Sequence, residues 1–96
     1  EHPAASLRGV IRSPDRARVF LYNLWRVACY DRDGHAWTSL GLFDADLVSV
    51  QLTGDVLSCL GYLDWIEPGR QFEILLSAVS GDVVGGDRVA FDLYSS

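Results

Sequence analysis

Residues 18–43 read RVFLYNLWRVACYDRDGHAWTSLGLF. The stretch opens on a nearly all-apolar run, residues 19–30, and turns back through residues 35–40 after the pair Asp33-Gly34. Two β-rich runs around Asp-Gly are the strongest short-range signal for a β-hairpin. The stretch therefore predicts a long antiparallel hairpin with strands Arg18–Asp31 and His35–Phe43.

The Asp-Gly pair also predicts the register of this hairpin. With Asp33 and Gly34 as the loop residues, Arg32 faces His35; further along, the facing pairs are Tyr30 with Trp37, Cys29 with Thr38 and Val27 with Leu40. Side chains alternate between the two faces of a strand, so this register sorts the hairpin into two sets. The set predicted to face the core is Trp25, Val27, Cys29, Thr38, Leu40 and Leu42. The set predicted to form a working surface is Tyr22, Leu24, Arg26, Tyr30, Arg32, His35 and Trp37.

The rest of the chain carries turn signals about every ten residues and little helical periodicity, which indicates an all-β domain. Further strands are expected at Ser6–Arg12, Val56–Trp65 (with a bulge or bend at Gly61), Gln71–Val79 and Arg88–Tyr94. Turns are expected at Ser13–Arg16, Thr53–Asp55 and Ile66–Arg70. Residues 44–52 fit either a short helix or a strand, and residues 80–87 are expected to be a loop. Residues 1–5 are predicted to be a flexible tail, and residues 6–96 one domain.

Charge is unevenly distributed along the 96 residues, whose net charge is −5. Residues 1–32 carry +3 and residues 33–96 carry −8, and all eight positive charges are arginines. An acidic total argues against a general nucleic-acid coat and leaves room for one local basic strip. No apolar run approaches the roughly 18–20 residues that span a bilayer, so no membrane segment is expected.

The chemistry-bearing residues do not form a recognisable catalytic set. The sequence has no nucleophile elbow, P-loop, zinc-protease helix or dinucleotide fingerprint, so no catalytic residue, cofactor or metal is predicted. Cys29 and His35 fall on opposite faces of the predicted hairpin, which argues against a dyad. Residues 31–34 resemble the start of a calcium loop but lack its later ligands and its flanking helices. Cys29 and Cys59 are expected to be buried free thiols, with a disulfide as the alternative.

The strand order resembles that of the OB-fold, a five-stranded Greek-key barrel. The matching segments are Leu7–Arg12, Val19–Tyr30, His35–Phe43, Gly54–Leu63 and Phe72–Ala78. The resemblance implies ligand binding on the strand 2–3 face and between the loops that join strands 1–2 and 4–5. The segment Glu67–Ile74 instead resembles a fibronectin type III sandwich. The predicted fold is a small antiparallel β-barrel, OB-like, or a β-sandwich of about six to seven strands.

Both the register and the resemblance point to one surface, rich in arginine and aromatic side chains. Its predicted binding residues are Arg12, Arg16, Arg18, Tyr22, Arg26, Tyr30, Trp37 and Arg70. Aromatic residues and arginine are enriched where proteins recognise proteins. The leading interpretation is a non-catalytic module that recognises a protein partner, which includes a second copy of itself. The alternatives are a single-stranded nucleic-acid-binding barrel and a domain that binds a small molecule or carbohydrate.

Overall fold

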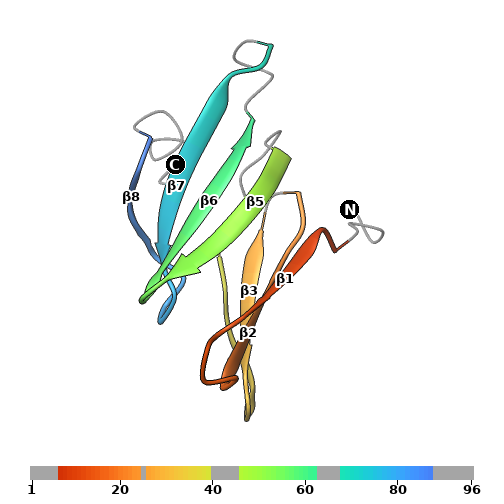
Figure 1. Ribbon diagram of the computed structural model, residues 1–96, viewed down its shortest axis with the longest axis vertical. Helices are drawn as coiled ribbons and strands as arrows, with labels where there is room; N and C mark the ends of the chain where they lie inside the picture. Colours follow the sequence, from red (N-terminus) through yellow and green to blue (C-terminus); the bar gives the residue numbers. More distant parts are fainter. Residues whose placement is uncertain (1–6, 25, 40–45, 63–67, 88–96) are drawn as a thin grey trace.

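A computed structural model describes residues 7–24, 26–39, 46–62 and 68–87 (Figure 1). It is all-β, as predicted. The strands are β1 (Gly9–Arg12), β2 (Arg18–Tyr22), β3 (Val27–Asp31), β4 (Gly34–Thr38), β5 (Asp46–Thr53), β6 (Val56–Tyr62), β7 (Gln71–Ser77) and β8 (Val83–Gly86). They form two four-stranded antiparallel sheets, in the orders β1-β2-β3-β4 and β5-β6-β7-β8. Figure 1 shows them as separate groups of strands, red to yellow and green to blue.

The two sheets pack together as a sandwich, so the barrel form of the prediction is not what the described strands make, and they number eight rather than six or seven. One core joins the sheets. From the first sheet it takes Phe20, Val27, Cys29 and Trp37; from the second it takes Leu47, Val50, Leu57, Cys59, Phe72, Ile74, Leu76 and Ala78. Both cysteines are buried and free, as expected.

The long strand predicted over residues 18–31 is wrong, because the chain turns within it. Asn23 N–H donates to the Arg26 carbonyl at 3.1 Å, and Arg26 N–H donates to Asn23 Oδ1 at 2.8 Å. Asparagine favours such turns because its side chain can bond the backbone nearby. The apolar run is therefore two strands, β2 and β3, joined by a turn that the Asn23 side chain holds.

The predicted register of the next hairpin is also wrong. Its loop residues are Arg32 and Asp33, since Asp31 pairs with Gly34, whose φ of 126° suits glycine. Tyr30 then pairs with His35 and Cys29 with Trp37, which leaves one extra residue in β4 as a β-bulge. A shift of this kind reverses the faces of the side chains. Trp37 consequently lies in the core, and Thr38 is exposed.

Other local predictions have mixed outcomes. The turns at Ser13–Arg16 and Thr53–Asp55 and the Pro68-Gly69 turn are present. Residues 46–53 are a strand, and the predicted loop 80–87 contains β8. The bulge expected at Gly61 lies opposite it, in β5 between Leu47 and Ser49. The predicted tail at residues 1–5, the strand Arg88–Tyr94, and Trp25, Leu40 and Leu42 of the predicted core face lie outside the described residues.

Candidate binding surface

The outer face of the first sheet brings together residues from all four strands. Pairing places Arg12 beside Val19, Val19 beside Tyr30, and Tyr30 beside His35. These side chains point outward because their neighbours along the strands, among them Phe20 and Cys29, point into the core. The Tyr30 side chain is 39% exposed, and its ring centroid lies 5.1 Å from that of His35. The row is basic at the β1 end and aromatic at the β4 end.

A hollow of about 210 Å³ lies at the end of this face, between the β1–β2 turn and the β3–β4 turn. We call it the arginine hollow. Its lining residues are Arg12, Arg16, Ala17, Arg18, Val19, Tyr30, Asp31 and Arg32. Four arginines and one aspartate give this lining a formal charge of +3, opposite in sign to the net charge of the chain.

Three of these arginines have uncommitted guanidinium groups. Within the described ranges, the side chains of Arg12, Arg16 and Arg32 form no hydrogen bond and no salt bridge. The nearby carboxylates are used by the turns instead. Asp31 Oδ1 accepts a hydrogen bond from the Asp33 amide at 2.9 Å. The hollow therefore presents three guanidinium groups that form no hydrogen bond or salt bridge within the described ranges.

The carboxylate of Asp15 also accepts hydrogen bonds within a turn, in this case the β1–β2 turn. Its Oδ1 accepts hydrogen bonds from the Ser13 hydroxyl at 2.6 Å and from the Ala17 amide at 2.9 Å. These two bonds, followed by the charges of Arg18 and Arg32, lower the pKa of Asp15 below its ordinary value. Asp15 thus stays ionised while it holds the turn in which Arg16 lies.

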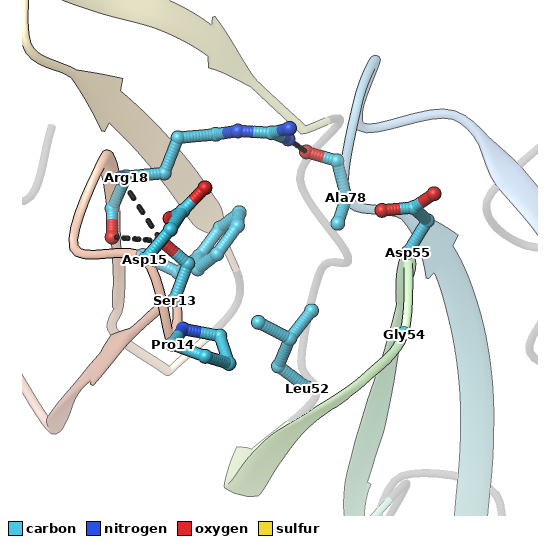
Figure 2. Close-up of a pocket in the computed structure, with 9 residues that line it drawn as sticks. Ser13, Pro14, Asp15, Arg18, Leu52, Gly54, Asp55 and Ala78 are labelled. Atoms are coloured by element: carbon cyan, nitrogen blue, oxygen red, sulfur yellow. Dashed lines mark hydrogen bonds between the residues drawn. The ribbon is translucent and has the colours of Figure 1, made fainter.

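Arg18 lines the arginine hollow but directs its guanidinium to the other side of the sheet. Figure 2 shows its side chain reaching from the β1–β2 hairpin to Ala78 of the second sheet, where Nη1 donates to the Ala78 carbonyl at 2.8 Å. Beneath it lies a cleft of about 250 Å³ between the sheets. This inter-sheet cleft has apolar lining from Phe20, Leu52 and Pro14 and acidic lining from Asp15 and Asp55.

A third hollow, of about 190 Å³, lies over the second sheet and is more apolar. Val48 and Leu60, which are 48% and 41% exposed, line it together with Tyr62. It carries no charged lining residue among those described. It is therefore unrelated to the predicted arginine-rich surface.

The predicted binding residues divide into two groups. Arg12, Arg16, Arg18 and Tyr30 meet at the arginine hollow. The other four do not: Trp37 is 8% exposed in the core, Tyr22 is partly buried against it, and Arg26 and Arg70 lie elsewhere. Arg26 Nη1 donates to the Ser39 carbonyl at 3.4 Å, and Arg70 Nη2 lies 4.0 Å from Asp87 Oδ1 near the second sheet.

Arg32 lines the hollow. It belonged to the predicted working surface but not to the predicted binding residues. Its place in the β3–β4 turn, two residues after Tyr30, was the available signal. No signal in the sequence pointed to the inter-sheet cleft, because its lining residues come from segments far apart in the chain. No group of three or more His, Cys, Asp or Glu side chains that could hold a metal is found in the described ranges. No helix in these ranges is long and apolar enough to cross a membrane.

Comparison of the chain with protein-family models, with curated proteins and with solved structures finds no match. The resemblances to OB-fold and fibronectin type III modules therefore stay predictions. The class that the structure defines is a small all-β sandwich of two meander sheets.

Proposed function

We propose that this domain is a non-catalytic binding module that recognises an acidic segment of a protein partner through the arginine hollow and Tyr30. The observation that carries the proposal is the set of three uncommitted guanidinium groups around one hollow, beside an exposed tyrosine. Arginine and tyrosine are enriched among the residues that dominate binding energy at protein interfaces. A lining charge of +3 favours an anionic partner.

Burial of Trp37 favours a protein partner over a nucleic acid. Single-strand binders stack successive bases on several exposed rings along a basic groove. On the outer face of the first sheet, within the described residues, Tyr30 and His35 are the aromatic side chains, and they contact each other. A net charge of −5 also weakens the long-range attraction on which non-specific binding of nucleic acid depends.

Binding of a glutamate-rich octapeptide, measured by amide chemical-shift perturbation, tests the proposal. We expect saturable shifts at Ala17, Val19 and Tyr30 that weaken as salt is added. Arg12→Gln should weaken binding about tenfold or more, since each charge-assisted hydrogen bond contributes about 1.5–3 kcal/mol. Arg8→Gln is the matched control. Arg8 is an exposed arginine directly before β1, and it does not line the hollow.

Two results would contradict this proposal. One is the absence of any shift at the hollow with the peptide. The other is tighter binding of a single-stranded oligonucleotide, which would assign the surface to nucleic acid.

Sedimentation equilibrium on the same samples tests whether the partner is a second copy of this chain. In that case the mass rises with concentration and Tyr30→Ala abolishes the rise.

A further inference from the structure

We infer that the group taken by the arginine hollow is a phosphate monoester carried on a side chain of the protein partner. The inference rests on the proposed function and names the chemistry of its ligand. It is drawn from the three arginines that line the hollow and form no hydrogen bond within the described ranges, from the backbone at Arg16, and from the apolar residues of the lining.

The three arginines come from separate segments and line one hollow. Arg12 ends β1, Arg16 lies in the β1–β2 turn, and Arg32 lies in the β3–β4 turn. A guanidinium group is a planar fork that matches two oxygens, and a phosphate monoester offers three terminal oxygens. One arginine suffices for a carboxylate, which has two oxygens. Three around a single hollow match the higher charge and oxygen count of a phosphate.

The backbone at Arg16 has a conformation in which an arginine is unusual. Arg16 has a φ of 61°, in the left-handed region, and its amide donates to the Ser13 carbonyl at 2.9 Å. This position follows the Pro14-Asp15 turn, where glycine is the usual residue because it has no Cβ. An arginine there is strained, and strain of this kind concentrates at functional sites. Arg16 lines the same hollow as Arg12 and Arg32.

The lining of the hollow also includes apolar surface. Ala17, Val19 and Tyr30 line it together with the arginines, and they offer apolar contacts for the stem of a phosphorylated side chain. Asp31 is the one carboxylate in the lining, and it is bound to the Asp33 amide. Four arginines against this one carboxylate leave the net charge of the described lining positive.

The test uses small defined probes, so that it does not depend on knowing the partner. We would titrate the intact protein with N-acetyl-phosphoserine amide and N-acetyl-phosphotyrosine amide, and follow the amide shifts of Ala17, Tyr30 and Arg32. The comparison probes are N-acetyl-glutamate amide, inorganic phosphate and a thymidine dinucleotide, which carries a phosphodiester. We expect at least one monoester to bind about tenfold more tightly than the glutamate probe.

Arg16→Gly is the decisive variant, because glycine suits the backbone at this position and the fold should be retained. It should weaken binding of the monoester about tenfold, while Arg8→Gln changes it less than twofold. The inference is overturned if Arg16→Gly binds the monoester as the unmodified protein does. It is also overturned if inorganic phosphate or the dinucleotide binds as tightly as the monoesters.

The outcomes separate this inference from the proposed function. Equal binding of the glutamate probe and the monoesters overturns the phosphate assignment and leaves an acidic partner in place. Shifts with none of the anionic probes, together with no response to the glutamate-rich peptide, overturn both.

Discussion

Arg18 and Trp37, from two strands of the first sheet, donate hydrogen bonds to one oxygen of the second sheet. Arg18 Nη1 lies 2.8 Å and Trp37 Nε1 lies 3.2 Å from the carbonyl oxygen of Ala78. Ala78 is 2% exposed, so its carbonyl depends on these donors rather than on bulk water. This shared acceptor connects the two layers of the sandwich at the end where the inter-sheet cleft opens.

Removing both donors should cost more stability than the two single losses added together. Either Arg18→Ala or Trp37→Phe leaves one donor on the Ala78 carbonyl, and each should lower the free energy of unfolding by about 1–2 kcal/mol. The double variant leaves a buried carbonyl without a donor, which adds about 1 kcal/mol of coupling. Urea unfolding of the four proteins measures the cycle. Arg12→Ala, whose side chain is free, should stay within about 0.5 kcal/mol of the unmodified protein. Strict additivity would show that the carbonyl is not a shared anchor.

Arg16→Gly should stabilise the domain by about 1 kcal/mol, because it relieves a left-handed conformation that disfavours side chains. Thermal unfolding measures the change. Arg32→Gly in the other turn is the control, since Arg32 has no positive φ and glycine gains nothing there. A loss of stability in Arg16→Gly would mean that the arginine side chain contributes more to the fold than its backbone strain costs.

Gly81→Ala should be among the most damaging single substitutions in the second half of the chain. Gly81 has a φ of 80°, and a Cβ there would lie 2.5 Å from Cε3 of Trp37. Strain and overpacking together should cost about 2–4 kcal/mol in urea unfolding. Gly54→Ala isolates the strain, because Gly54 has a φ of 60° and open space around it. A cost no larger than that of Gly54→Ala would show that the Trp37 ring moves aside freely.

Both thiols should resist modification in the folded protein. Burial raises the pKa of Cys59 from its ordinary value of 9.0 to about 12, and burial also raises the pKa of Cys29. At pH 8 a disulfide reagent such as dithionitrobenzoate should react with neither thiol before unfolding and with both in urea. Rapid reaction of the native protein would show that the core opens readily at these strands.

The same burial predicts how stability depends on alkaline pH. The unfolded chain releases the thiol protons near pH 9, whereas the folded chain retains that of Cys59 until about pH 12. The unfolded state is therefore favoured as pH rises, and the contribution of Cys59 to stability is lost between pH 9 and 12. Urea unfolding at pH 8 and pH 10 measures the fall, which should be smaller in Cys59→Ala.

The sequence predicts the local features of this fold well, because single residues determine them. The Pro14-Asp15 and Pro68-Gly69 turns are visible in the residues that favour them. Arg12 and Tyr30 lie on one outer face, as the predicted binding surface had them, but the two-strand separation depends on the turn at Asn23.

Trp37 shows where this reasoning fails. Its face depends on a one-residue bulge in β4, which reverses the side chains beyond it. The change in the two loop residues shifts the pairing by two and would by itself leave Trp37 on the face of Tyr30. The turn at Asn23 was missed because Leu24 and Trp25 continue the apolar run through it. The bond from Arg18 to Ala78 joins residues 60 positions apart, and such a contact depends on how whole sheets pack. The arginine hollow could therefore be predicted in part, and the inter-sheet cleft could not.

Each sheet is built from one continuous half of the chain, with every strand paired to its neighbour in sequence. No backbone ladder between described strands crosses from one half to the other, so a cut between Ser39 and Asp46 would leave both ladders whole. The domain is thus suited to fragment complementation: two separately produced halves should reassemble through the shared core, with the Ala78 carbonyl as the point of registration. Such a scaffold suits assays in which each half is fused to one of two proteins, and reassembly of the halves reports that the two proteins associate.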